Sequence, residues 1–174
     1  CLSASAKQIV GSSKTFTESY IMSEIVSQQI EKTPEYSVER KYGLGATGIT
    51  FEAVKSGKID MYVEYTGTIA EAILKTDNIK EIEGLQKRLD SYGLVVSRSL
   101  GFNNTYTFVA TKEFAEQHNL KKISDLKRVA DLAIPGVTYE FLNRHDGYRA
   151  MMKTYGINLK SEPVSMEHSL IYQA

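Results

Sequence analysis

The stretch "GKIDMYVEYTGT", residues 57–68, decides which fold we expect for this chain. Gly57 ends one helix, a short apolar strand then runs toward Tyr65, and Thr68 begins the next helix. Short strands and amphipathic helices also alternate before and after this stretch, which is the pattern of an α/β protein. The sequence therefore predicts an α/β fold in which a strand delivers Tyr65 to a turn.

The chain before this stretch is expected to supply two strands and two helices. Thr15 and Glu18 have the spacing of a capping box, and apolar residues follow at helical spacing as far as Ile30. Free N–H groups at this helix start, beside Lys14, would suit an anionic ligand group, although an ordinary capped helix beside a solvated lysine has the same sequence. The expected strands are residues 7–13 and 36–42, and the expected helices are residues 16–31 and 49–57.

The chain after this stretch changes character at Gly101. A helix is expected at residues 78–92 and a strand at residues 93–100, and a turn-rich segment then runs into an extended strand that ends at Thr111. We interpret this segment as the crossing between two lobes. The expected lobes are residues 1–104 and 105–174, and the sheet of the second lobe is expected to be incomplete within this chain.

Composition argues against several classes of function. The 174 residues include 21 Lys or Arg and 21 Asp or Glu, so the net charge is zero and nucleic acid is not an expected partner. No apolar run approaches the roughly 18 residues that cross a bilayer. The three histidines are far apart in the sequence, and neither a P-loop nor a cysteine cluster accompanies them. We therefore expect neither catalysis, nor a metal, nor a cofactor.

A glycine motif leaves one enzymatic alternative open. Gly43, Gly45 and Gly48 satisfy the G-x-G-x-x-G pattern of a dinucleotide-binding loop, which would indicate a nucleotide-dependent enzyme. The strand that feeds such a loop is normally a buried apolar run, whereas residues 39–41 are all charged. A tight turn and close helix packing are the plainer use of these glycines.

Tyrosine is the abundant aromatic residue, with 11 Tyr, 6 Phe and no Trp. Tyr65 and Tyr106 lie near expected strand ends, where a ring face can attract a cation within about 6 Å of its centroid. A quaternary ammonium group offers no hydrogen-bond donor, so its capture depends on such faces. A carboxylate on the same ligand needs Lys, Arg, hydroxyl or helix N–H groups. These residues indicate a binding function, although each tyrosine taken singly also fits a core or surface position.

Several motifs, taken in order, resemble one known family. They are "SSKTFTESYIMSEIV", "GLGATGITFEAVKSGKIDMYVEYTGT", "LGFNNTYTF", "ISDL" and "FLNRHDGY", with "YGINL" after the last. Over residues 7–174 the chain resembles the substrate-binding proteins of bacterial ABC importers for osmoprotectants of the glycine betaine, choline and carnitine type. The resemblance implies a periplasmic-binding-protein-like fold, in which two α/β lobes joined by a hinge close over the ligand. It also implies delivery of the ligand to the importer's membrane subunits. A sensor domain for another small cation is the alternative within this fold.

The resemblance implies ligand-binding roles for six residues. It places Tyr65 and Tyr106 in an aromatic box, with Asn104 near the cation. It places Lys14, Thr68 and Arg144 at the ligand carboxylate, with Arg144 coming from the second lobe. Ser19 departs from the family, because many relatives have Gln after "FTE", and this change affects a polar contact that helps set ligand preference.

The two ends of the sequence carry further expectations. Cys1 with the following "LSASAK" resembles the start of a mature bacterial lipoprotein, which would be anchored at the outer face of the cytoplasmic membrane. The alternative is that Cys1 is only where the numbering begins, and a periplasmic location is then expected. Relatives continue beyond "LIYQA" with a segment that supplies further box tyrosines and completes the first lobe. We expect a truncated form that exposes apolar edges and dimerises or binds ligand weakly, with a pocket completed by a second copy as the alternative.

Overall fold

The chain divides into two compact units in the computed structural model, which describes residues 6–76, 79 and 81–173. Unit 1 comprises Cys1–Leu100, and unit 2 comprises Gly101–Ala174. Each unit has its own sheet and its own cluster of buried apolar residues. The expected lobe boundary between residues 104 and 105 stays a prediction.

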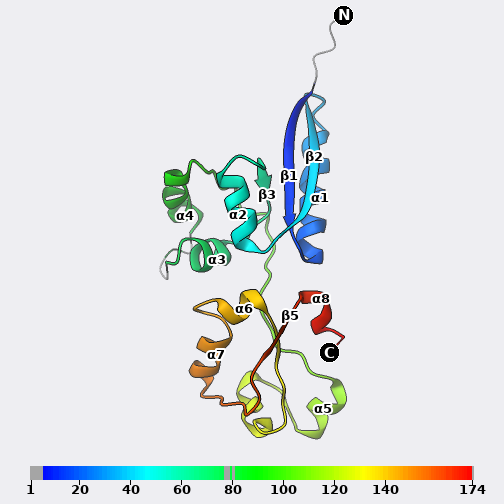
Figure 1. Ribbon diagram of the computed structural model, residues 1–174, viewed down its shortest axis with the longest axis vertical. Coiled ribbons are helices and arrows are strands. Elements are labelled where there is room, and N and C mark those ends of the chain that lie inside the picture. The colour runs from blue at the N-terminus through cyan, green and yellow to red at the C-terminus, as the bar shows by residue number, and fades with distance from the viewer. Residues whose placement is uncertain (1–5, 77–78, 80, 174) are drawn as a thin grey trace, which may run out of the picture. The chain divides into compact units, whose positions relative to one another are not determined.

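Unit 1 is built on a three-stranded parallel sheet with the strand order β2-β1-β3. The strands are β1 (Lys7–Lys14), β2 (Tyr36–Gly45) and β3 (Met61–Tyr62), and the helices α1 (Thr17–Glu31) and α2 (Thr47–Lys55) connect them (Figure 1). Parallel strands need crossover connections, and α1 and α2 serve as the two crossovers. The strands predicted at residues 7–13 and 36–42 are confirmed, and β2 is an edge strand as expected.

Helix α1 turns a stripe of serines, rather than its apolar residues, toward the sheet. Its buried residues are Ser19, Ser23 and Ser27. Ile21 and Ile25 are 53% and 55% exposed. The Ser23 hydroxyl donates to the carbonyl oxygen of Ser12 in β1 at 2.7 Å, and the Ser27 hydroxyl donates to the carbonyl oxygen of Ser23 at 2.8 Å. Hydrogen bonds therefore satisfy the polar groups that α1 buries, as buried hydroxyls require.

The end of β3 leads into the helical half of unit 1. The segments are α3 (Thr66–Thr68), the π-helical turn η1 (Ile69–Ile73), α4 (Ile82–Leu89) and the 3₁₀ turn η2 (Asp90–Tyr92). Their apolar faces meet in a cluster of Ile69, Ala70, Leu85 and Leu89. The helix predicted at residues 78–92 begins only at Ile82 in the structure, and positions 78 and 80 lie outside the described residues.

The segment between the helices of unit 1 and those of unit 2 is irregular. Residues 94–111, all of them described, contain no strand. The strand predicted at residues 93–100 and the extended strand predicted to end at Thr111 are therefore wrong. Val95 and Val109 are 88% and 68% exposed. Leu94 and Val96 are partly buried against the apolar cluster of unit 1, but they pair with no strand. β-propensity alone does not produce a strand without a partner.

Unit 2 combines short helices with a two-stranded parallel sheet. Its elements are α5 (Lys112–Gln117), η3 (Ile123–Val129), β4 (Gly136–Thr138), α6 (Tyr139–Asn143), α7 (Tyr148–Tyr155), β5 (Val164–Met166) and α8 (His168–Ile171) (Figure 1). Val137 of β4 pairs with Ser165 of β5. The buried cluster of this unit consists of Val137, Phe141, Tyr148, Met152 and Ile157. Gly156 ends α7 in the left-handed conformation, at φ 59°, which glycine adopts without strain.

The orientation of α1 predicts that two nearby substitutions change the free energy of unfolding by different amounts. Ser27→Leu forces a larger apolar side chain against the sheet and removes the Ser27 hydroxyl, so we expect a loss of about 1–3 kcal/mol in the free energy of unfolding. Ile25→Lys adds a charge to an exposed position and should change it by less than about 0.5 kcal/mol. Urea denaturation of both variants measures the difference. A larger loss for Ile25→Lys than for Ser27→Leu would contradict the serine-inward orientation.

Candidate functional site

The register of the unit 1 sheet brings the ends of β1 and β3 together. Ser12 of β1 pairs with Tyr62 of β3. Lys14 is the last residue of β1, and Glu64 follows the end of β3 by two residues, so both lie at this end of the sheet. The stretch that decides the fold thus delivers Glu64 and Tyr65 to the end of β1.

Lys14 and Glu64 form a buried ion pair. Lys14 Nζ lies 2.6 Å from Glu64 Oε1, and the two side chains are only 2% and 6% exposed. Lys14 Nζ also donates to Thr47 Oγ1, at the start of α2, at 3.4 Å. Glu64 Oε1 accepts a further hydrogen bond, at 3.0 Å, from the backbone N–H of Tyr65. Buried charges need such partners, because an isolated ion loses its hydration without compensation.

Two aromatic rings lie against the Lys14 ammonium group. Lys14 Nζ is 5.2 Å from the ring centroid of Tyr65 and 5.4 Å from that of Phe16. The two rings stack with centroids 6.3 Å apart and an interplanar angle of 29°. Both distances are within the range in which a ring face attracts a cation. This group of side chains, Lys14, Phe16, Glu64 and Tyr65, is called the Lys14 cluster below.

The start of α1 supports the Lys14 cluster. The N-cap residue is Phe16, so the predicted capping box at Thr15 is wrong. The Glu18 carboxylate instead accepts a hydrogen bond from the hydroxyl of Tyr65. Ser19, which departs from the family pattern, is buried, and its hydroxyl accepts a hydrogen bond from the Lys14 backbone N–H at 2.8 Å. Glu18 and Ser19 therefore hold Tyr65 and Lys14 from α1.

Unit 2 contains a second cation over a tyrosine ring. The guanidinium carbon of Arg144 lies 5.8 Å from the ring centroid of Tyr106. The Tyr106 ring in turn stacks on Phe141, with centroids 4.4 Å apart. Arg144 Nε and Nη2 each donate to a different carboxylate oxygen of Asp146 at 2.8 Å. Arg144 thus has both an aromatic and an acidic neighbour, as Lys14 has in unit 1.

The ionisation of Arg144 and Asp146 reflects this contact. Burial opposes the charge of Arg144, but the hydrogen bond and the negative charge of Asp146 outweigh it and raise the pKa of Arg144. Burial likewise opposes the charge of Asp146, yet the Arg144 guanidinium lowers the pKa of this carboxyl. Both groups are therefore charged at neutral pH.

Four of the predicted site residues lie together in two pairs. Each pair combines a residue expected at the ligand's carboxylate with one expected at its cation. Within unit 1, Lys14, expected at a carboxylate, lies over the ring of Tyr65, expected at a cation. Within unit 2, Arg144 and Tyr106 repeat this combination. The remaining predicted residues are Thr68, buried at the end of α3, and Asn104, exposed in the irregular segment.

Sequence reasoning missed three members of the site. Glu64 directly precedes Tyr65 and is a charged residue at the end of an apolar strand. This unusual position could have identified Glu64 as a site residue. Phe16 lies two residues after Lys14, and nothing in its local pattern separates it from a core aromatic. Thr47 is brought to Lys14 only by the packing of α2, which the sequence does not show.

Two of the three glycines of the dinucleotide-like motif, Gly43 and Gly45, have steric uses, whereas a Cβ atom at Gly48 would meet nothing within 4 Å. Gly43 has φ 70°, and a side chain there would overlap the hydroxyl of Tyr20. Gly45 has φ 153°, and a Cβ atom there would lie 2.8 Å from Ile49 Cδ1. Both conformations favour glycine, and both glycines belong to β2, where the chain turns toward α2. This agrees with the plainer use of the motif, a tight turn with close helix packing.

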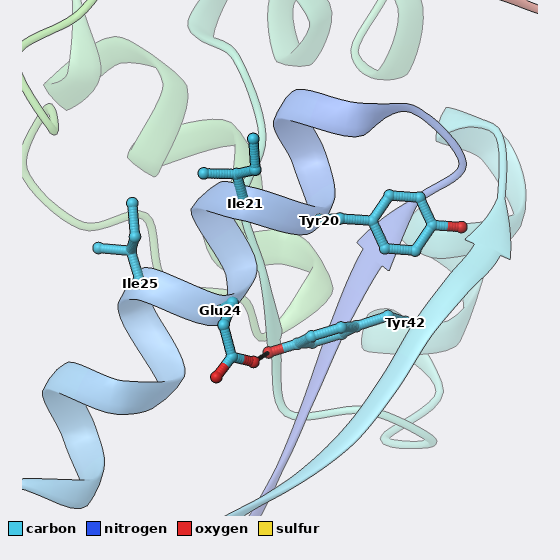
Figure 2. Close-up of a pocket in the computed structure, with 5 residues that line it drawn as sticks. All are labelled: Tyr20, Ile21, Glu24, Ile25 and Tyr42. Carbon is cyan, nitrogen blue, oxygen red and sulfur yellow. Dashed lines mark hydrogen bonds between the residues drawn. The ribbon is translucent and has the colours of Figure 1, made fainter. Parts of the chain in front are cut away.

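Unit 1 also has an open hollow of about 400 Å³ between α1 and β2. It is lined by Tyr20, Ile21, Glu24, Ile25 and Tyr42 (Figure 2). Figure 2 shows Glu24 reaching toward Tyr42, whose hydroxyl donates to Glu24 Oε2 at 2.9 Å. Glu24 also pairs with Arg40 at 2.8 Å. None of the six residues expected to bind the ligand lines this hollow, whereas the Lys14 cluster contains Lys14 and Tyr65, so the Lys14 cluster is the stronger candidate site.

Two parts of the localisation hypothesis can be set against the structure. Cys1, the expected lipid attachment site, lies outside the described residues. Within the described ranges, no helix is both long and apolar enough to cross a bilayer.

Comparison with known proteins defines the class of this two-unit α/β protein. The family model described as "Substrate binding domain of ABC-type glycine betaine transport system" matches residues 7–174. A solved structure described as a glycine betaine/carnitine/choline ABC transporter superposes with a TM-score of 0.68 at 26% identity, over 98% of this chain and 64% of that chain. The fold is therefore periplasmic-binding-protein-like.

Two relatives support the same assignment. The carnitine transport binding protein OpuCC of Listeria monocytogenes is 33% identical over 173 residues, covering 91% of this chain and 53% of that protein. A glycine-betaine-binding protein of Pseudomonas aeruginosa is 33% identical over 175 residues, covering 92% of this chain and 56% of that protein. The chain thus spans just over half the length of these relatives. It belongs to the family of substrate-binding domains of ABC-type glycine betaine transport systems. This membership does not favour the nucleotide-dependent enzyme.

The Arg40 contacts beside the hollow predict a pH dependence of stability. Hydrogen bonding to Arg40 lowers the pKa of Glu24 from 4.5 to about 2, and Arg40 also lowers the pKa of Glu31. Because these values fall on folding, the stabilisation is fully present above about pH 4.5 and is lost as the pH falls toward 2. Arg40→Gln should therefore lower the urea midpoint at neutral pH and leave it almost unchanged near pH 2.

The matched control for Arg40→Gln is Lys41→Gln. Lys41 contacts Glu39 at 3.3 Å on the same strand, with both side chains more exposed. We expect little change in this control at any pH, since exposed ion pairs contribute little. An equal loss of stability near pH 2 and at neutral pH in Arg40→Gln would contradict the account.

Proposed function

We propose that this protein binds a small quaternary-ammonium osmoprotectant, such as glycine betaine, carnitine or choline, and delivers it to the membrane subunits of an ABC importer. Family membership over residues 7–174 supports the class of function. Relatives named for carnitine and for glycine betaine support the class of ligand. We propose no catalytic step for the chain itself.

The observation that carries this proposal is the cation held over two ring faces in unit 1. The Lys14 ammonium lies 5.2 Å and 5.4 Å from the centroids of Tyr65 and Phe16. A trimethylammonium group is attracted to the same faces, and because it has no hydrogen to donate, it depends on them more than a lysine does. The rings that hold Lys14 are therefore suited to the cationic end of a betaine.

The residues proposed for the ligand divide into two chemical sets. Tyr65, Tyr106 and Asn104 are proposed for its cationic end. Lys14, Thr68 and Arg144 are proposed for its carboxylate, since ammonium, hydroxyl and guanidinium groups are donors to an anion. We add Phe16 to the first set, because its ring lies against the same ammonium as Tyr65.

We further propose that the protein works at the cell envelope, where an importer meets its ligand. If Cys1 carries a lipid, the protein is anchored at the outer face of the cytoplasmic membrane. Mass spectrometry of protein extracted from native membranes tests this part. An unmodified or extended N-terminus would contradict the anchor without affecting the ligand proposal.

Calorimetry with glycine betaine, carnitine, choline and NAD tests the proposed function in the full-length protein. We expect heat of binding from at least one quaternary-ammonium compound and none from NAD. Binding of NAD alone would instead support the nucleotide-dependent enzyme. Binding of none of the four would overturn the proposed class of ligand.

Two substitutions at Tyr65 separate the role of its ring from that of its hydroxyl. Tyr65→Ala removes the ring face and should weaken binding of the quaternary-ammonium ligand by about tenfold or more. Tyr65→Phe keeps the ring face and loses the hydrogen bond to Glu18, so its loss of affinity should be smaller. Calorimetry measures both, with Tyr92→Ala as the control, since that ring lies under Lys55 instead. Equal losses from the two Tyr65 variants would refute the ring-face model.

A further inference from the structure

We propose that Lys14 is the resident cation of the aromatic site in unit 1 and that ligand binding exchanges it for the ligand's own ammonium group. This exchange makes the site selective for zwitterions over simple cations. The inference rests on the proposed function and adds to it a residue that sets selectivity, Lys14, and its partner Glu64.

The ring faces of Phe16 and Tyr65 are already occupied by a cation of the protein. Phe16 and Tyr65 stack with their centroids 6.3 Å apart, and Lys14 Nζ lies over both. The Lys14 side chain is 2% exposed, so its ammonium is held inside the cluster rather than in solvent. A ligand cation that binds these same faces must therefore displace the ammonium of Lys14.

The carboxylate of Glu64 holds Lys14 in place. Glu64 Oε1 contacts Lys14 Nζ at 2.6 Å and also accepts the Tyr65 backbone N–H at 3.0 Å. The second bond anchors the Glu64 carboxylate to the chain that carries the Tyr65 ring. When Lys14 moves away, Glu64 stays beside this ring as the counter-charge for an incoming cation. Lysine is suited to such a movement, because its ammonium sits on a flexible four-carbon stem.

The charges of Lys14 and Glu64 keep partners during the exchange only if the ligand is a zwitterion. A zwitterion brings an ammonium group, which takes the place beside Glu64, and a carboxylate, which becomes the new partner of Lys14. Before the exchange Lys14 is paired with Glu64, and after it Glu64 is paired with the ligand ammonium and Lys14 with the ligand carboxylate, so no charge is left without a partner. A simple cation such as choline brings only the first group, so Lys14 would be displaced without an anion to receive it. An unpaired buried charge is strongly unfavourable, so the site disfavours choline.

Unit 2 supplies an independent observation of the same kind. Arg144 lies over the ring of Tyr106 and is paired with Asp146 at two oxygen atoms. Each unit thus places its predicted carboxylate-binding cation on the face of its predicted box tyrosine, with an acidic residue beside it. A repeated combination of cation, ring and acid is what an exchange mechanism needs.

The test compares glycine betaine with choline by calorimetry in the full-length protein. The wild type should bind glycine betaine more tightly than choline. In Lys14→Met the ammonium no longer occupies the ring faces and the ligand carboxylate has lost its partner, so choline should gain affinity while glycine betaine loses it. We expect the ratio of the two association constants to shift toward choline by about tenfold or more, the scale of one charged contact. Lys14→Arg keeps the charge and should keep the preference for glycine betaine.

Two further variants guard the interpretation. Lys14→Met leaves Glu64 buried with one partner fewer, so folding is checked by circular dichroism, and Lys14→Met/Glu64→Gln removes both charges if the single variant unfolds. This double variant should also shift the ratio toward choline. Lys55→Met is the matched control, because Lys55 lies 5.6 Å from the Tyr92 centroid and 3.0 Å from Glu52 but is 39% exposed. It should leave both affinities unchanged.

The outcomes separate this inference from the proposed function. A shift toward choline in the Lys14 variants, but not in Lys55→Met, supports the exchange. Retained binding with an unchanged ratio in the folded Lys14 variants overturns the exchange and leaves the proposed function standing. A wild type that prefers choline also overturns the exchange alone. A wild type that binds neither compound overturns the proposed function and the exchange together.

Discussion

The buried ion pair between Lys14 and Glu64 is the interaction on which the candidate site depends. It joins the end of β1 to the end of β3, and Thr47 brings the start of α2 to the same ammonium group. Taking two charges out of water costs several kcal/mol for each ion, which only good geometry and further hydrogen bonds offset. The backbone N–H of Tyr65 supplies such a bond. The ion pair therefore holds Tyr65 at the start of α3 and holds the Lys14 ammonium against the Tyr65 ring.

The serine stripe of α1 belongs to the same arrangement. Ser19 holds the backbone of Lys14, and Ser23 holds that of Ser12, so α1 is attached to β1 through hydroxyl groups. Small side chains allow this polar contact, which larger apolar residues would prevent. Ile21 and Ile25 are consequently left on the outer side of the helix. Unit 1 thus uses polar contacts near its candidate site, where an ordinary crossover helix would bury apolar side chains.

The sequence was sufficient for the fold class and for much of the element order, because strands such as β1 and β2 carry clear local patterns. It failed where tertiary contacts decide. The apolar spacing of α1 does not show that its serines face the sheet, and the apolar residues of 94–111 form no strand in this described segment. The resemblance named Lys14 and Tyr65 for opposite ends of the ligand, whereas the structure places the Lys14 ammonium over the Tyr65 ring. It did not reveal that Glu64 and Phe16 complete that place, since the pairing depends on the register between β1 and β3.

The central claim is that the Lys14 ammonium is buried over two aromatic rings. A heteronuclear NMR spectrum of the lysine side-chain ammonium groups tests it most directly, with the Lys14 signal identified by its loss in Lys14→Gln. The account predicts a separate, slowly exchanging signal whose protons are shifted upfield by the rings of Phe16 and Tyr65. A Lys14 signal that exchanges rapidly at the position of the surface lysines would contradict it.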